Sequence, residues 1–278
     1  MKKITRRSFM AAAGLTAAAL ALTACGGSAS STASSTASSA ASSEAASTSA
    51  AAELTTVEAG KLTMATNATF PPYEMTTDSG EIEGIDVDTA KAIAEKLGLE
   101  LQIDDMDFDA ALLSVQQGKA DIVMAGVTVT DERKAVMDFS DNYATGIQSI
   151  IVPEGSDIAS PDDLAGKKIG TQRGTTGYIY CSDDFGDDAV VAYDDGLTAV
   201  QALKNGQVDA VVIDNAPAKE YVAANPGLVI LDTSYAEEDY AIGMAKGSAL
   251  EDAVNAALEE LKADGTLQSI VDKYITAE

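Results

Sequence analysis

Arg133 stands in the first turn of a predicted helix, just after a predicted buried strand that ends at Ala125. Thr130 is a good N-cap, and Asp131 and Glu132 suit the positive helix end, but an arginine gains nothing from the dipole there. Its planar guanidinium matches the two oxygens of a carboxylate. We therefore interpret Arg133 as an anion-binding residue. The alternative is a surface arginine paired with a neighbouring acid.

Asp214 has the corresponding place in the second half of the chain, after the predicted strand at 208–213. It either caps the next helix or faces a cleft as a fixed negative charge suited to an ammonium group. Earlier in this half, residues 171–177 join a strand to a helix that begins near Thr175, and their backbone N–H groups would add donors for the anion. An anion site and a cation site together describe a zwitterion.

Phe70 and Phe108 each follow a strand in the first half. Aromatic residues make up only 5% of the chain, and there is no tryptophan. Both can be core residues, and Phe108 also fits the apolar face of its own helix. If they line a cleft, their flat faces would clamp the side chain of a ligand.

The chain contains no histidine. This excludes Ser-His-Asp and Cys-His nucleophile systems, imidazole metal sites and histidine proton relays. Neither a dinucleotide-binding glycine turn nor a P-loop is present, so nucleotide use is not indicated. Among 44 acidic residues, any chosen pair is more readily a solvated face than a catalytic dyad. We expect no cofactor, no metal and no catalytic residue.

Apolar spacing predicts helices that alternate with strands. Ala90, Ile93, Ala94 and Leu97 form one helical face, and Gly98 follows as a stop signal. Short apolar strands are predicted at 61–66, 99–103 and 120–125, and again at 167–171, 189–192 and 208–213. This alternation favours an α/β fold with parallel sheets covered on both faces.

The two halves of the chain echo each other. QGKADIVM at 117–124 matches NGQVDAVV at 205–212, and each is a helix stopped by glycine before a buried strand. One such unit per half predicts two similar α/β lobes. Two apolar helices near the end have no strand after them and are expected to pack on the first lobe, so the chain would cross twice, near 148–152 and 240–245. The expected bounds are 54–147 with 241–278 for lobe 1, and 148–240 for lobe 2.

Residues 1–24 have the pattern of an export signal, with a basic start and an apolar stretch from Phe9 to Leu22. That stretch is shorter than the roughly 20 residues that cross a bilayer. LTAC at 22–25 resembles the lipobox of bacterial lipoproteins, so we expect Cys25 to be lipidated. The alternative is a free cysteine after an ordinary signal peptide. Arg6 and Arg7 leave both twin-arginine and general export open.

Residues 25–53 are almost wholly Ser, Ala, Thr and Gly, cannot bury a core, and are expected to form a flexible tether to the membrane. The formal charge of −26 would repel phosphate backbones, so nucleic acid is not an expected partner. Cys181 is the only cysteine beside Cys25, and no intrachain disulfide is expected.

Eight short motifs, in order, resemble the polar amino-acid-binding proteins of bacterial ABC importers, which have the type II periplasmic binding fold. They are FPPYE at 70–74, GIDVD at 84–88, MDF at 106–108, AGVTVTDER at 125–133, MDFS at 137–140, GTT at 174–176, VDAV at 208–211 and ADGT at 263–266. The resemblance covers nearly all of residues 62–274.

By this resemblance, Arg133 would bind the α-carboxylate of the ligand, helped by Thr128 and by Thr176 at a helix start. Asp214 and the carbonyl of Gly126 would bind the α-ammonium. These implied roles agree with the zwitterion site inferred from Arg133 and Asp214.

Phe70 and Phe108 would sandwich the ligand side chain, with Gln172 near it. At Asn67, relatives that prefer Lys, Arg or His tend to carry an acid, so this departure favours an uncharged polar amino acid. Gln172 and Ile213 provide no decisive selector.

The resemblance implies a monomeric, lipid-anchored extracytoplasmic protein that captures a free amino acid by hinge closure and delivers it to the membrane permease of an ABC importer. Two alternatives remain from other classes. One is an enzyme on the same fold, such as a cyclohexadienyl dehydratase. The other is a sensor subunit that presents its ligand to a membrane receptor.

Overall fold

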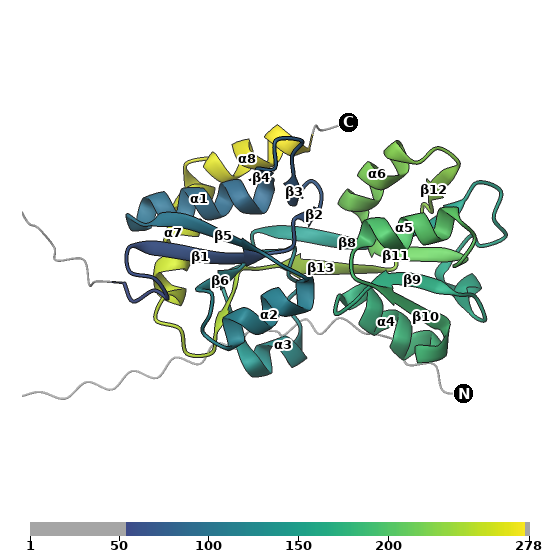
Figure 1. Ribbon diagram of the computed structural model, residues 1–278, viewed down its shortest axis with the longest axis horizontal. Helices are drawn as coiled ribbons and strands as arrows, with labels where there is room; N and C mark the ends of the chain where they lie inside the picture. The colour runs from purple at the N-terminus through teal and green to yellow at the C-terminus, as the bar shows by residue number, and fades with distance from the viewer. Residues whose placement is uncertain (1–53, 276–278) are drawn as a thin grey trace, which may run out of the picture. The chain divides into compact units, whose positions relative to one another are not determined.

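The computed structural model describes residues 54–275, which contain two α/β lobes (Figure 1). The first lobe is built on a five-stranded sheet in the order β5-β1-β6-β14-β7. Its strands are β1 (Lys61–Thr66), β5 (Glu100–Asp105), β6 (Ile122–Val123), β7 (Met137–Phe139) and β14 (Gly243–Ala245). A small sheet of β2 (Thr69–Phe70), β3 (Glu74–Thr76) and β4 (Ile82–Glu83) lies beside it. The helices of this part are α1 (Ile85–Leu97), α2 (Phe108–Gln116) and α3 (Asp131–Val136).

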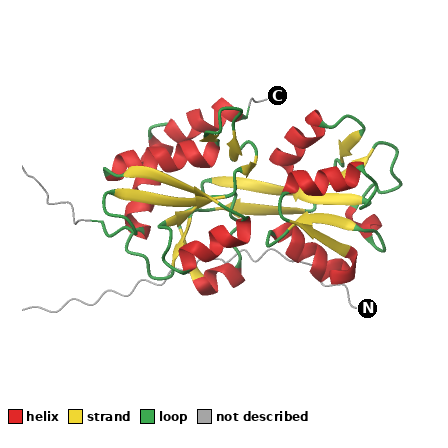
Figure 2. Ribbon diagram, viewed as in Figure 1, coloured by secondary structure: helices red, strands yellow, loops and turns green. Residues whose placement is uncertain are grey.

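The second lobe is built on a sheet in the order β10-β9-β11-β8-β12, with β13 also paired to β8. Its strands are β8 (Ala144–Pro153), β9 (Ile169–Gln172), β10 (Val190–Tyr193), β11 (Ala210–Asp214), β12 (Leu228–Ile230) and β13 (Ala236–Tyr240). The helices are η1 (Pro161–Leu164), α4 (Thr176–Phe185), η2 (Asp187–Ala189), α5 (Gly196–Lys204) and α6 (Asn215–Ala224). Figure 2 shows helices flanking the strands in both lobes.

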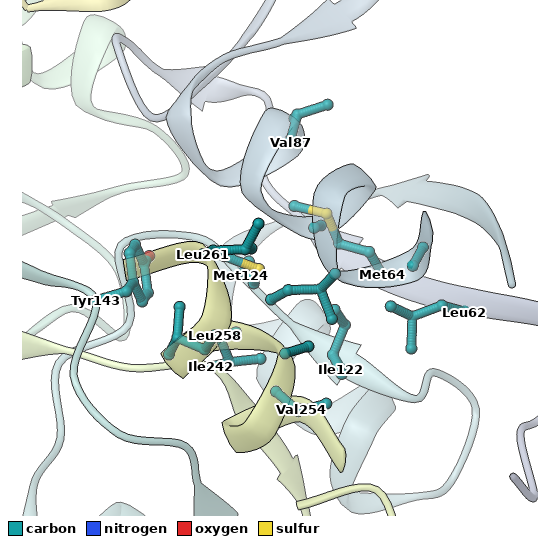
Figure 3. Packing of buried hydrophobic residues seen from close by; sticks show 14 of the residues in the cluster. Leu62, Met64, Val87, Ile122, Met124, Tyr143, Ile242, Val254, Leu258 and Leu261 are labelled. Carbon is teal, nitrogen blue, oxygen red and sulfur yellow. The ribbon is translucent and has the colours of Figure 1, made fainter. Parts of the chain in front are cut away.

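The first core forms because α1 carries one apolar face. Ala90 and Ile93 are fully buried. The predicted stop signal, Gly98, ends the helix in the left-handed conformation at φ 70°. Figure 3 shows how buried side chains of β1 and β6, among them Leu62 and Ile122, pack together with residues of the C-terminal part of the chain. This core holds β1 and β6 in place, and the residues that follow these two strands include Asn67 and Gly126.

The C-terminal helices α7 (Glu251–Ala263) and α8 (Thr266–Tyr274) return to the first lobe, as expected. Val254, Leu258 and Leu261 of α7 are buried in the same core as β1 (Figure 3). The chain therefore reaches this lobe a second time after building the other one.

The two similar segments, 117–124 and 205–212, lie at equivalent places in the two sheets. Gly118 and Gly206 both have positive φ, 66° and 69°, and each precedes the strand that lies third in its sheet order, β6 or β11. The predicted parallel pairing holds for β5, β1 and β6 and for β10, β9 and β11. Each sheet also contains antiparallel pairs, because β14 pairs antiparallel with β6 and β8 pairs antiparallel with β11. These antiparallel strands arrive from the opposite lobe, which local periodicity does not reveal.

Two strands connect the lobes (Figure 1). β8 pairs antiparallel with β13 from Ala144↔Tyr240 to Gln148↔Ala236, and β8 then continues into the second sheet beside β11. This two-stranded connection confirms the fold class predicted from the sequence. It also places residues of β13 next to the ends of strands from both lobes.

No helix within residues 54–275 has the length and apolarity needed to cross a membrane. Cys181 is a free thiol buried in the core of the second lobe, and burial raises its pKa to about 12. The predicted export signal, Cys25 and the tether at 25–53 lie outside the described residues.

Candidate functional site

A cavity with charged, polar and aromatic walls lies between the lobes, lined by the ends of strands and the starts of helices from both. It has a volume of about 410 Å3 including its opening. All ten residues predicted as ligand-binding line it, and they are Asn67, Phe70, Phe108, Gly126, Thr128, Arg133, Gln172, Thr175, Thr176 and Asp214. Residues far apart in sequence therefore meet in one place.

Arg133 belongs to α3, whose N-cap Thr130 accepts a hydrogen bond from the Arg133 backbone N–H at 3.2 Å. The residue is only 8% exposed, and burial lowers the pKa of its guanidinium. Nη1 donates to the carbonyl of Thr128 at 2.7 Å and Nη2 to that of Gly174 at 3.1 Å. No acid of residues 54–275 forms an ion pair with it, so the alternative of a paired surface arginine does not fit. A buried cation without a counter-charge in contact is suited to an anionic ligand.

Asp214 ends β11 and is 2% exposed. Its Oδ1 accepts from the backbone N–H of Ala216, which makes it the N-cap of α6. Its Oδ2 accepts from the hydroxyl of Tyr240 at 2.7 Å and from the backbone N–H of Ile147 at 2.9 Å. Burial raises the pKa of Asp214 to about 6, against the effect of these hydrogen bonds. The two sequence interpretations, helix cap and acid facing a cleft, are thus compatible.

The two threonines predicted to help the anion site come from different lobes. Thr176 opens α4 and Thr128 follows β6, and their hydroxyl oxygens are 3.5 Å apart. Thr175 is the N-cap of α4, because its hydroxyl oxygen accepts from the backbone N–H of Tyr178 at 3.3 Å. The first turn of α4 therefore faces the lobe that carries Arg133, with backbone N–H groups suited to an anion.

Gly126 and the two aromatics form the wall of the cavity. Gly126 has φ 56°, and a Cβ on it would lie 2.8 Å from Cε1 of Phe70, so a side chain is excluded here on two grounds. Phe108 is 5% exposed and packs in the core under α2, while the Arg133 guanidinium carbon lies 5.4 Å from its ring centroid. Phe108 accordingly serves as a core residue and as cavity wall.

Asn67 and Gln172 connect the lobes at the cavity. Gln172 Nε2 donates to Asn67 Oδ1 at 2.9 Å, and Asn67 Nδ2 donates to the carbonyl of Met106 at 2.9 Å. Both side chains are neutral amides, with donors and acceptors but no charge.

Five further residues line the cavity, which are Glu74, Ala125, Gln148, Ile213 and Tyr240. Sequence reasoning considered Ile213 only as a selector of the ligand side chain and missed the other four. Glu74 is fully buried, and neither of its oxygens nor Oδ1 of Asp86 receives a hydrogen bond from another described group. Burial and the nearby Asp86 raise the pKa of Glu74 well above its ordinary value, which favours the neutral form of Glu74. Its place in the FPPYE motif was the only signal for it.

Two α/β lobes joined by two strands, with a cavity between them that is lined by both, define a solute-binding protein. The chain matches the model of "Bacterial extracellular solute-binding proteins, family 3" over residues 62–277 and belongs to that family.

Individual relatives agree with this assignment. A "Probable histidine-binding protein" of Neisseria gonorrhoeae is 34% identical over 96% of this chain and 95% of its own length. The "Arginine-binding extracellular protein ArtP" of Bacillus subtilis is 34% identical over 78% of this chain and 87% of its own. Among solved structures, "An ancestral arginine-binding protein bound to glutamine" has 44% identity and a TM-score of 0.75, covering 78% of this chain and 99% of that one. These relatives are binding proteins and not enzymes.

Proposed function

We propose that this protein binds a free L-amino acid in the cavity and delivers it to the permease of an ABC importer. The observation that carries the proposal is the presence in one cavity of Arg133 from the first lobe and Asp214 from the second. A guanidinium fork matches an α-carboxylate, and a buried carboxylate matches an α-ammonium. The names of the relatives support the same class of ligand.

The proposed ligand has an uncharged polar side chain. The neutral amides of Asn67 and Gln172 support this, since they match a hydroxyl or amide but supply no counter-charge. The cavity aromatics Phe70 and Phe108 would hold the aliphatic part of that side chain between them.

A cationic amino acid is the second candidate. Besides the neutral Glu74, three buried acids lie at or beside the cavity, Asp86, Asp214 and Glu238, and Arg133 is the only buried base in residues 54–275. This excess of negative charge favours a ligand with a net positive charge and disfavours acidic amino acids. The histidine- and arginine-binding relatives named above support this candidate as well.

Closure of the lobes is the proposed mechanism, with lobe 1 at 54–147 and 241–278 and lobe 2 at 148–240 as its moving bodies. The bonds from Arg133 to Gly174 and from Gln172 to Asn67 join the two bodies at the cavity. A ligand with one pole on each body would stabilise the closed arrangement, which the permease would recognise.

Calorimetry of the purified protein tests this function. The panel is L-glutamine, L-asparagine, L-cystine, L-arginine, L-lysine, L-histidine and L-glutamate. Arg133→Ala and Asp214→Asn should each abolish binding while circular dichroism shows an intact fold. Unchanged binding in either variant, or no binding of any amino acid by the wild type, would contradict the proposal.

Lipid anchoring through Cys25, with residues 25–53 as tether, is part of the same proposal, and the protein is expected to act as a monomer outside the cell. A receptor-linked sensor would use the same ligand site. Uptake of a labelled amino acid by cells that lack the permease distinguishes the importer role from the sensor role. Uptake must stop in these cells if the protein serves the importer, and it need not change if the protein serves a receptor. Membrane fractionation of Cys25→Ala tests the anchor, with release of the protein as the expected result.

A further inference from the structure

Glu238 is a buried acid at the anion end of the cavity. It lies on β13, one of the two connecting strands, and is 6% exposed. Its Oε2 accepts hydrogen bonds from the hydroxyls of Thr128 and Thr176, both at 3.0 Å. Gln148 Nε2 donates to the same oxygen at 3.0 Å. One carboxylate on β13 thus contacts donors from both lobes and from the other connecting strand, β8.

These are the two hydroxyls that the family resemblance assigns to the α-carboxylate of the ligand. A hydroxyl has a single proton, so Thr128 and Thr176 donate either to Glu238 or to a ligand, and not to both. With their protons directed to Glu238, the hydroxyls present lone pairs to an incoming carboxylate. The ligand carboxylate can then bind to the Arg133 guanidinium and to backbone N–H groups, but it receives no hydrogen bond from the two threonine hydroxyls.

The charge of Glu238 acts in the same direction. Two like charges in a water-poor site repel each other strongly, and the second oxygen of Glu238, Oε1, accepts no hydrogen bond from the described residues. Glu238 also interacts electrostatically with Arg133, the residue expected to attract the ligand carboxylate. Part of the positive potential of Arg133 is thereby offset before any ligand enters.

We propose that Glu238 is an affinity-determining residue that competes, as an internal carboxylate, with the α-carboxylate of the ligand for the hydroxyls of Thr128 and Thr176. The inference rests on the proposed amino-acid site and names the group that weakens it. A reason for such a group is release, since a carrier that holds its ligand too tightly delivers it slowly.

Glu238→Gln is the direct test. The amide retains the shape and one acceptor, removes the charge, and its N–H group can donate to the threonine oxygens, which frees their protons for the ligand. We expect L-glutamine or L-arginine, whichever the wild type binds, to bind about tenfold tighter or more, the effect of one hydrogen bond to a charged group.

Glu237→Gln is the matched control. Glu237 is the preceding residue of β13 and is exposed, so this variant removes the same charge without touching the threonines. Its affinity should stay within about twofold of the wild type because exposed charges are screened. Equal tightening in both variants would overturn the proposal in favour of a general charge effect.

The α-carboxamides of L-glutamine and L-arginine provide the second arm. They lack the carboxylate that Glu238 opposes, so the Glu238→Gln variant should bind them no more tightly than the wild type does. If Glu238→Gln does not fold, Glu238→Met removes the charge with a similar volume, and failure of both variants to fold would overturn a role in affinity. If the wild type binds an amino acid and a folded Glu238 variant binds it no more tightly, this inference alone is overturned. If the wild type binds no amino acid, the proposed function is overturned as well.

Discussion

Arg133 Nη2 donates to the carbonyl of Gly174 at 3.1 Å, so the guanidinium of one lobe contacts the backbone of the other. Gly174 has φ 75°, and a Cβ there would meet Asp109 of the first lobe at 3.5 Å. The lobes therefore approach each other closely at the anion end of the cavity. Arg133 contributes to this approach through Nη2. Its Nη1 donates to the carbonyl of Thr128, just before the N-terminus of α3.

The first prediction follows from that geometry. Arg133→Lys keeps the charge but replaces a planar fork by one ammonium, which cannot reach two carbonyls and a carboxylate at once. We expect amino-acid affinity to fall about 10- to 100-fold, corresponding to the loss of one hydrogen bond with a charged partner. Calorimetry measures it, with Arg173→Lys as control because that side chain is half exposed and pairs with Asp194 on the surface. An unchanged affinity in Arg133→Lys would contradict the assigned role.

Helices were predictable because their signals are local. Gly98 ended α1 where its sequence indicated, and Thr130 and Thr175 both cap the helices they precede. The strand expected at 120–125 shrinks to β6, Ile122–Val123, which are the two residues in ladder register with Met64 and Ala65 of β1. Pairing depends on chain segments far away in sequence, and a local pattern carries no information on them.

The site residues also divide into those with a local sequence signal and those that only the tertiary structure reveals. Arg133 and Asp214 were found because they follow buried strands, where ligands bind in α/β folds. Glu238 was not found, since it stands in an acidic run beside Glu237 and has the same residue type. Only tertiary structure buries one and exposes the other.

A second prediction concerns the pH dependence of binding. Burial raises the pKa of Asp214 to about 6, and an ammonium group binds its ionised form. Affinity should thus be constant above pH 7 and fall as the pH drops through 6, approaching tenfold per unit. Calorimetry at pH 5.0 to 8.0 tests this. Asp86 titrates near 6 too, so Asp86→Asn is the control, and its profile should retain the fall. A flat wild-type profile would exclude Asp214 as the ammonium partner.

Stability should change with pH in the opposite direction. Asp86 and Asp214 have pKa values raised to about 6 in the folded protein, against an ordinary value near 3.9 when unfolded. Between about pH 4 and pH 6 the folded state binds more protons, so the free energy of unfolding falls as pH rises through this range. Without ligand, we expect a higher melting temperature at pH 5.5 than at pH 7.5. Asp214→Asn should reduce the difference, and Asp183→Asn, at an exposed position, should not.

Glu74 provides a fourth prediction. Burial and the nearby Asp86 raise its pKa well above the ordinary value, so we expect a neutral Glu74 that donates its proton to Asp86. Glu74→Gln retains a donor and should change the free energy of unfolding by less than about 1 kcal/mol, while Glu74→Leu removes the donor and should cost ~2 kcal/mol or more. Urea unfolding at pH 7 measures both variants. A large loss in Glu74→Gln would show that Glu74 is ionised.

The last prediction tests ligand selection at Asn67. Asn67→Asp keeps an acceptor for Gln172 Nε2 but adds a negative charge to a wall that is now neutral. It also loses the donor to the Met106 carbonyl, which should lower stability by about 1 kcal/mol. Because the added charge attracts cations, we expect affinity for L-arginine relative to L-glutamine to rise about tenfold. Competition calorimetry gives that ratio, and Asn142→Asp, outside the cavity, is the control. An unchanged ratio would mean that position 67 does not contact the ligand side chain, and selection would then belong to Gln172 and the aromatic walls.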